Sequence, residues 1–242
     1  MLIIETKNYK EMSKRAASLI SDIINDKPDA VIGFATGKTP LGLYKELVDL
    51  NKKKKIDFSK VTSFNLDEYY PIKKNDMNSY YTYMHKNLFD KINIKKQNIN
   101  LLNGETKKPK EECSSYEKKL RKNKIDIQIL GLGVNGHIGF NEPGSEFNSK
   151  TRLVKLSPET IEINKKKLND RSEIPWNALS MGIKSIMSAK KIILLASGKN
   201  KARAIKELIE GKIRSDYPAT FLKKHKDLIV IIDKEAGSLL RK

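Results

Sequence analysis

AVIGFATGKTPLGLYKELVDL, residues 30–50, decides the fold class of this chain. Its first six residues form a short apolar run that is typical of a buried strand. A polar turn with a glycine follows at residues 36–39, and Pro40 then opens a run of helical periodicity that ends at Leu50. A strand, a tight polar turn and a helix in this order predict one βα unit of an α/β protein.

The same alternation of apolar runs and helical patterns extends along the chain. Strands that alternate with helices pair in parallel and are joined by crossover connections. We therefore expect one domain, residues 1–242, with a three-layer, Rossmann-like α/β fold: a central, mainly parallel sheet with helices on both faces. The further predicted strands are 61–66, 125–130, 191–196 and 227–232, and the further predicted helices are 9–24, 79–89, 110–122 and 199–209.

The composition is that of a folded but strongly basic protein. Of its 242 residues 38% are hydrophobic and 32% are charged, and the formal net charge is +19. Most of this charge comes from lysines scattered over many expected helices, and the dense runs 52–55 and 165–167 lack the interleaved aromatic residues that stack on bases. We interpret the lysines as solvated surface rather than a nucleic-acid site. A positive field would also suit an anionic substrate.

Cysteine usage and hydropathy indicate a cytoplasmic protein. The single cysteine, Cys113, cannot form an intrachain disulfide, and no histidine stands beside it, so we expect an unreactive thiol. The apolar run of three residues before Glu5 is too short for a signal peptide. No apolar stretch approaches the roughly 20 residues of a membrane span, so we expect no membrane partner.

Polar segments follow four of the predicted strands directly. They are 36–40, 67–69, 131–144 and 197–201. Ligands of open parallel sheets bind beyond the carboxyl ends of the strands. We therefore expect these four segments to converge on one cleft.

Two of the four segments have the chemistry of an anion site. Thr36, Gly37, Lys38 and Thr39 stand at a predicted helix start, where backbone N–H groups and the helix dipole favour an anion. An ordinary βα turn capped by threonine explains the same residues equally well. Residues 197–201 repeat the pattern, and Lys199 and Lys201 would need compensation near a helix N-terminus. A bound anion would provide it, although a solvated lysine pair remains the alternative.

The third segment, GLGVNGHIGFNEPG at residues 131–144, matches GxGxxG without being a dinucleotide motif. The motif needs a helix that opens on the glycines, and Pro143 with the flanking glycines argues against one. We expect a long functional loop. It carries His137 and Glu142, which together can act as acid and base on hydroxyl protons. The chain's other histidines, His85 and His225, are expected to be solvated, and no metal site is expected.

The fourth segment brings an aspartate to the same edge. Asp67 closes a predicted strand, where it can act as a base or cap the next element. Glu68, beside it, has no specific role in the pattern.

Read together, these segments resemble the glucosamine-6-phosphate deaminase family. FNLDEYY (64–70), ATGKTP (35–40) and GLGVNGHIGFNEPG (131–144) carry the resemblance. Residues 79–89, 98–104 and 194–202 extend it over nearly the whole chain. FNEP at residues 140–143 is its most specific part, because the related 6-phosphogluconolactonases share the acidic pair and the GH loop but continue differently.

The resemblance implies a reaction and a set of roles. Members convert glucosamine 6-phosphate and water into fructose 6-phosphate and ammonia without a cofactor. By this resemblance Asp67 would move a proton from C2 to C1, and His137, supported by Asn135 and Glu142, would open the sugar ring. The phosphate would be held by Thr36, Gly37, Lys38, Thr39 and Lys201, and by Lys166 on a mobile lid around residues 157–176.

Three classes of function remain open at this stage. The first is the deaminase, and the second is a sugar-phosphate lactonase or isomerase on the same fold. The third is a sugar-phosphate-sensing or nucleic-acid-binding protein that lost the chemistry. Some family members are hexamers activated by N-acetylglucosamine 6-phosphate. Arg152 and Ser145 fall where effector contacts would be, but Val154 stands where regulated members are basic, so we expect no such regulation, and a homo-oligomer is possible.

Overall fold

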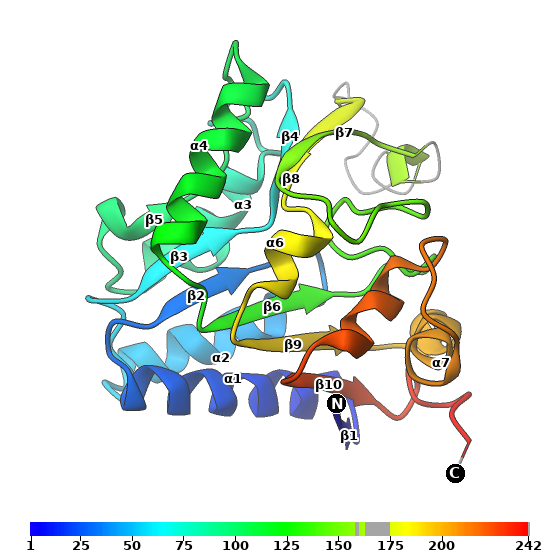
Figure 1. The fold of residues 1–242 in the computed structure, drawn as a ribbon. Helices are drawn as coiled ribbons and strands as arrows, with labels where there is room; N and C mark the ends of the chain where they lie inside the picture. Colours follow the sequence, from blue (N-terminus) through cyan, green and yellow to red (C-terminus); the bar gives the residue numbers. More distant parts are fainter. Residues whose placement is uncertain (158–159, 163–174, 242) are drawn as a thin grey trace.

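A seven-stranded parallel sheet forms the centre of the computed structural model, which describes residues 1–157, 160–162 and 175–241 (Figure 1). The strand order is β1-β10-β9-β6-β2-β3-β5, and every pair in it is parallel. The predicted fold class is confirmed. The strands are β1 (Leu2–Thr6), β2 (Val31–Phe34), β3 (Thr62–Asn65), β5 (Ile99–Asn100), β6 (Ile127–Gly131), β9 (Lys191–Ala196) and β10 (Leu228–Asp233).

Helices cover both faces of this sheet and bury one apolar cluster against each face. α1 (Tyr9–Asp26), α2 (Leu41–Lys52) and α3 (Tyr80–Asn87) pack on one face. α4 (Pro109–Lys122), α6 (Ile183–Met187) and α7 (Ala202–Glu210) pack on the other. Short 3₁₀ segments complete the connections: η1 (Phe89–Lys91), η2 (Lys96–Asn98), η3 (Lys199–Lys201) and η4 (Pro218–Lys224).

The spacing of apolar residues explains why α1 takes its place. Met12, Ala16, Ile20 and Ile24 recur every four residues and are almost completely buried, so they form one stripe along the helix. Asn8 caps the helix, because its side chain accepts the N–H of Glu11 at 3.0 Å. At α2, Pro40 is the capping residue rather than the first helical one, and the predicted helix at 199–209 begins as the 3₁₀ turn η3.

A second, three-stranded sheet was not expected from the sequence. β4 (Asp67–Tyr70), β8 (Asn177–Ser180) and β7 (Arg152–Lys155) pair antiparallel in the order β4-β8-β7. β4 has the sequence DEYY, and acidic residues are depleted in strands, so propensity argued against it. β1 was missed as well, because its apolar run is short and it is an edge strand that depends on β10.

One residue joins the two sheets. Leu66 follows β3 and donates its N–H to the carbonyl of Phe34 in β2, at 3.2 Å. Its own carbonyl accepts the N–H of Met181 at 2.8 Å, and Met181 directly follows β8. The backbone therefore passes from the parallel to the antiparallel sheet at Leu66, which places the next residue, Asp67, at the boundary between them.

The helices of the described residues include none that is long and apolar enough to cross a membrane.

The phenol of Tyr116 holds the end of β3, and its removal should destabilise the fold. Its hydroxyl donates to the carbonyl of Asn65 at 2.7 Å and accepts the N–H of the same residue at 3.0 Å, in a buried setting. We expect Tyr116→Phe to lower the free energy of unfolding by about 1–3 kcal/mol, because it leaves a buried N–H without its partner. Urea denaturation measures this. Tyr70→Phe, which removes a half-buried bond to the Thr106 carbonyl, should cost less, and equal losses would contradict the argument.

Candidate active site

The four segments predicted to converge do line one cavity. It has a volume of about 570 Å³ and opens at the carboxyl ends of the central strands. Tyr80 of α3 and Thr160, which the sequence did not single out, also line it. The residues from the four segments are Thr36, Gly37, Lys38 and Thr39; Asp67; Gly131, Leu132, Gly133, Val134, His137, Gly139 and Phe140; and Ser197, Asn200 and Lys201.

Three tyrosines hold the carbonyl groups of the loop after β2. Tyr44 of α2 donates its hydroxyl to the Ala35 carbonyl, and Tyr83 of α3 donates to that of Gly37. Tyr9 of α1 donates to the Lys38 carbonyl at 3.2 Å. Gly37 has a φ of +97°, which an L side chain rarely adopts. Each of the three helices therefore fixes one peptide of the loop whose residues 36–39 face the cavity.

A buried carboxylate fixes the loop after β9. Asp233 ends β10 and accepts the hydroxyl of Ser197, the N–H of Gly198 at 3.1 Å and the N–H of Ala236 at 2.8 Å. Lys201 follows in η3 and lines the cavity, whereas Lys199 does not. Lys38 and Lys201 thus bring two positive charges to the described lining.

The loop at residues 131–144 brings an imidazole, an amide and a carboxylate together. His137 Nδ1 lies 2.7 Å from Asn135 Oδ1, and the amide of Asn135 donates to Glu142 Oε2 at 3.1 Å. Glu142 also accepts the hydroxyl of Thr160. Because Asn135 Oδ1 can only accept, Nδ1 of His137 carries a proton, and in the neutral ring Nε2 is then the basic nitrogen.

Contacts from a distant segment hold this loop in place. Ala219 donates its N–H to the Gly136 carbonyl at 2.8 Å, and Gly144 donates to the Ser215 carbonyl at 2.9 Å. The ring of Tyr217 lies so close to Gly136 that a β-carbon there would come within 2.3 Å of it. The segment after α7 therefore forms the support of the histidine loop.

Asp67 is buried at the floor of the cavity. Its burial, and next the negative charge of Glu68, raise the pKa of its carboxyl to about 8. Gly139 has a φ of +56°, and a β-carbon added to it would lie 3.2 Å from Asp67 Oδ2. The glycine therefore lets the histidine loop approach this carboxyl closely. Asp67 begins β4 rather than closing the preceding strand, which ends at Asn65.

Glu68, to which the sequence pattern gave no role, is 1% exposed and fully engaged. Its carboxylate accepts the N–H groups of Tyr69 at 2.9 Å, Tyr80 at 2.8 Å and Tyr81 at 2.8 Å. Burial raises its pKa to about 7, although these three hydrogen bonds oppose the rise. In the sequence, the only hint of a role for Glu68 was that it directly follows Asp67, so that two carboxylates stand side by side.

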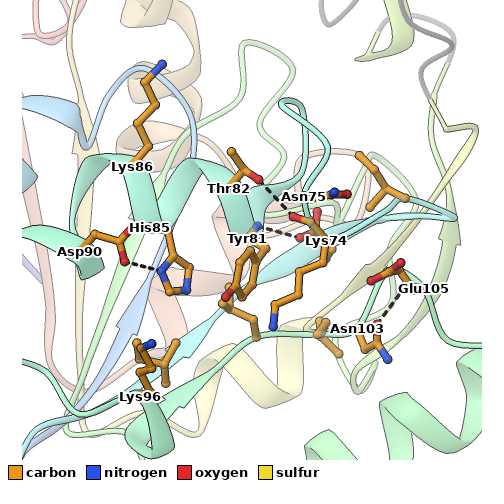
Figure 2. Close-up of a pocket in the computed structure, with 16 residues that line it drawn as sticks. Lys74, Asn75, Tyr81, Thr82, His85, Lys86, Asp90, Lys96, Asn103 and Glu105 are labelled. Atoms are coloured by element: carbon orange, nitrogen blue, oxygen red, sulfur yellow. Dashed lines mark hydrogen bonds and ion pairs between the residues drawn. The ribbon is translucent and has the colours of Figure 1, made fainter.

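A larger hollow of about 880 Å³ lies on the other side of β4 and α3 (Figure 2). Its labelled residues include Lys74, Tyr81, His85, Lys96 and Glu105, and Glu68 is part of its wall. Neighbouring residues of a strand point to opposite sides, so Asp67 lines the smaller cavity and Glu68 the larger hollow. Asp67, His137, Lys201 and residues 36–39 meet in the smaller cavity, which we take as the candidate active site. Asn135 and Glu142 do not line it; they lie behind His137, where Asn135 contacts both the imidazole and Glu142.

The expectation that His85 and His225 are solvated is wrong. Both are half-buried, and His85 Nδ1 lies 2.7 Å from Asp90 Oδ1. His225 accepts the N–H of Asp227 and contacts the Ala189 carbonyl, so its role is structural. Asp90 and Asp227 lie close to their histidines in sequence, but polarity alone does not show which side chains meet, and Ala189 comes from a distant segment.

Cys113 is buried, which raises its pKa to about 11, so the expectation of an unreactive thiol is confirmed. Among the described residues no three His, Cys, Asp or Glu side chains are grouped as metal ligands. Lys166 and most of the predicted lid at 157–176 lie outside the described residues.

Comparison with known proteins gives a consistent result over the whole chain. A sequence model of the family described as glucosamine-6-phosphate isomerases/6-phosphogluconolactonase matches residues 5–230. A curated glucosamine-6-phosphate deaminase of Clostridium botulinum (strain Langeland) is 52% identical over 242 residues, which is 100% of this chain and 99% of that protein.

Solved structures give matches to the same families of enzymes. A protein described as a monomeric glucosamine-6-phosphate deaminase matches with a TM-score of 0.95 and 43% identity, covering 99% of this chain and 100% of its own. The 6-phosphogluconolactonase from Leishmania guyanensis matches with a TM-score of 0.78 and 19% identity, covering 100% and 99%. The second likeness concerns the fold alone.

The raised pKa of Asp67 predicts that this residue destabilises the protein as the pH rises. Between the value of about 4 in the unfolded chain and about 8 in the fold, the folded protein binds more protons, so its stability falls with increasing pH. Asp67→Asn removes the ionisation. We expect the variant to be more stable than the wild type above about pH 8 and equal to it below about pH 4. Thermal unfolding across this range measures the difference.

Asp126→Asn is the matched control with the opposite sign. Burial opposes the charge of Asp126, but hydrogen bonds from Lys190, Lys27 and the Val31 N–H hold its pKa below the usual range. Its charge therefore stabilises the fold at neutral pH, and this variant should lose stability there. A loss of stability at pH 8 in Asp67→Asn as well would contradict the argument.

Proposed function

The chain belongs to the glucosamine-6-phosphate isomerase/6-phosphogluconolactonase family, and on this premise we propose that it is a glucosamine-6-phosphate deaminase of amino-sugar breakdown. It would convert glucosamine 6-phosphate and water into fructose 6-phosphate and ammonia. The observation that carries the proposal is the buried carboxyl of Asp67, which shares one cavity with His137, Lys38 and Lys201. That cavity combines a strong base, an acid/base imidazole and an anion site.

The substrate is anchored by its phosphate. Residues 36–39 and Lys201 line the same cavity as Asp67 and His137. The loops that carry them are already held in place, one by tyrosines and the other by Asp233. Anchoring the far end of the sugar positions C1 and C2 at the reactive groups. Lys166 remains a predicted further contact. A lysine there supplies charge but not the bidentate fork of an arginine.

His137 opens the sugar ring. With Nδ1 bound to Asn135, its Nε2 takes the proton of the anomeric hydroxyl, and the resulting imidazolium returns a proton to the ring oxygen. The C1–O5 bond breaks and the aldehyde forms. Asn135 and Glu142 keep the imidazole in the tautomer that this step needs.

Asp67 then moves one proton within the opened sugar. The carbonyl at C1 makes the C2 proton acidic, and the carboxylate of Asp67 removes it. The C1 oxygen takes a proton from the ammonium group of the substrate, which gives a neutral enolamine. Return of the proton to C1 gives a ketose imine at C2. Water adds to the imine and ammonia leaves, with fructose 6-phosphate as the other product. A carboxyl with a pKa of about 8 suits a proton carrier, because it is basic when ionised and keeps the proton between the two transfers.

The alternatives find less support. A lactonase needs no base at C2. The relatives named above at 52% and 43% identity bear the deaminase name, whereas the lactonase structure is 19% identical. A sensing protein would have no need of a buried, strongly basic Asp67 beside His137. The expectation of no regulation and the possibility of a homo-oligomer stay predictions. Arg152 donates to Asn141 Oδ1 at 2.9 Å, and the structural relative is described as monomeric.

A product assay tests the proposal directly. The purified protein should release ammonia and fructose 6-phosphate in equal amounts from glucosamine 6-phosphate. Galactosamine 6-phosphate and 6-phosphogluconolactone, with and without EDTA, serve as comparisons. Hydrolysis of the lactone without release of ammonia would favour the lactonase, and no turnover of any of them would favour a sensing protein.

Replacing the proposed base should abolish turnover and keep binding. We expect Asp67→Asn to lower kcat by about 10²–10⁴-fold, because proton transfer to a positioned base contributes that much. The affinity for fructose 6-phosphate, measured by calorimetry, should change little, since the phosphate contacts remain. Turnover near the wild-type rate would show that another group removes the C2 proton.

A further inference from the structure

Glu68 stands directly behind the proposed base and is the feature of the molecule that the mechanism above does not use. It is almost completely buried, although a carboxylate rarely is without a specific partner. All its described hydrogen bonds are to backbone N–H groups, and no described ion pair neutralises it. A charge retained at this cost next to a reactive residue calls for a function.

The first contribution of Glu68 is mechanical. Tyr80 and Tyr81 are the first two residues of α3, so the carboxylate of Glu68 satisfies N–H groups at the helix start, where an anion is favourable. α3 in turn supplies Tyr80 to the cavity wall, where its ring stacks on Phe140 at a centroid distance of 6.0 Å. The same helix supplies Tyr83, which holds the Gly37 carbonyl. Glu68 therefore connects β4 to the helix that supplies both the cavity wall and the tyrosine that holds the loop at residues 36–39.

The second contribution of Glu68 is electrostatic. Among the causes that raise the pKa of Asp67, burial is the largest and the charge of Glu68 is the next. The carboxyl of Glu68 accepts three backbone N–H groups, which favour its ionised form, whereas the described hydrogen bonds include none to the carboxyl of Asp67. Glu68 therefore ionises first, and its charge is present when Asp67 ionises. The adjacent carboxylates thus titrate as a coupled pair whose second step is delayed.

Other charges around the pair do not reproduce this effect. Asp67 shares its cavity with Lys38, His137 and Lys201, whose positive forms favour its ionisation, and with Tyr80. On the side of Glu68, Asp76 raises the pKa of Glu68 further, and Figure 2 shows Lys74, His85 with Asp90, Lys96 and Glu105 around the hollow. β8, paired with β4, brings the apolar Ala178 and Leu179.

We propose that Glu68 is a positioning residue for Asp67: its carboxylate anchors the start of α3, and its negative charge keeps the neighbouring base strong. This inference rests on the proposed function, in which Asp67 removes the C2 proton. It assigns no contact between Glu68 and the substrate, because Glu68 lies in the wall of the other hollow.

The pH dependence of kcat/KM for glucosamine 6-phosphate tests the inference. The acidic limb of this profile reports the base of the free enzyme, so in the wild type it should lie near the pKa of Asp67, about 8. Glu68→Gln keeps the size of the side chain and removes its charge, which makes Asp67 easier to ionise. We expect the limb to move to lower pH by about one unit, with a lower maximal rate because the base is weaker.

Three matched variants separate charge from structure. Glu68→Asp keeps the charge and shortens the reach, so it should lower kcat and leave the limb in place. Ser79→Ala removes the hydroxyl that caps α3 through the Thr82 N–H, and it too should leave the limb in place. Glu105→Gln removes an exposed charge from the same hollow and should have no effect. A limb that stays in place in Glu68→Gln, or that moves equally in Ser79→Ala, would overturn the proposal.

A measurement on the wild type keeps the test valid if Glu68→Gln does not fold. Carboxyl ¹³C NMR of aspartate-labelled protein, with the Asp67 signal assigned by its loss in Asp67→Asn, should show two steps. The main step is that of Asp67, and a smaller step near pH 7 reports the charge of Glu68. A single step near the ordinary aspartate pKa of about 4 would overturn the proposal. This readout does not need turnover, so it stays informative if the product assay fails.

Discussion

The burial of two adjacent carboxyl groups at the boundary between two sheets is the constraint on which this molecule depends. Leu66 is bonded to both sheets, and β4 begins at the next residue. Because a strand alternates its side chains, Asp67 faces the cavity and Glu68 faces the opposite hollow. The antiparallel sheet, α3 and the histidine loop all pack around this pair. The destabilised carboxyl is therefore maintained by a large part of the fold, as is usual for functional groups with perturbed pKa values.

The remaining site is organised by bonds that satisfy backbone groups away from the ligand. Tyrosines from three helices take the carbonyls of the loop after β2, and Asp233 takes the N–H of Gly198. If these loops bind the phosphate as proposed, little conformational entropy is lost on binding, because the loops are already ordered. The scattered lysines that give the chain its charge of +19 contribute a general field, and two of them, Lys38 and Lys201, reach the cavity.

The sequence was informative where local patterns decide structure. Periodicity and turn residues predicted β2, β3, β6, β9 and β10 of the central sheet and five of the helices on it, but not β1, β5 or α6. The rule that ligands bind at the carboxyl ends predicted which segments meet. It failed for β4, because DEYY forms a strand only when β8 pairs with it. It failed for Glu68, because the backbone N–H groups that this carboxylate binds are those at the start of α3, and the sequence does not show that α3 begins beside it. Thr160 and the supporting tyrosines were missed because each contacts a residue of another element, which the fold and not the local pattern brings near.

The support of the histidine loop by the segment after α7 has a consequence for how the protein is made. A ribosome delivers residues in order at about 5–20 per second, so the loop emerges several seconds before Ser215 and Ala219, which hold it. β1 waits longer still for β10. A nascent chain can form the βα units around β2 and β3 early, but it cannot yet present His137 to Asp67. Catalytic competence is thus acquired in one late step, after the scaffold has emerged, and a partly synthesised chain has a fold in progress without an active enzyme.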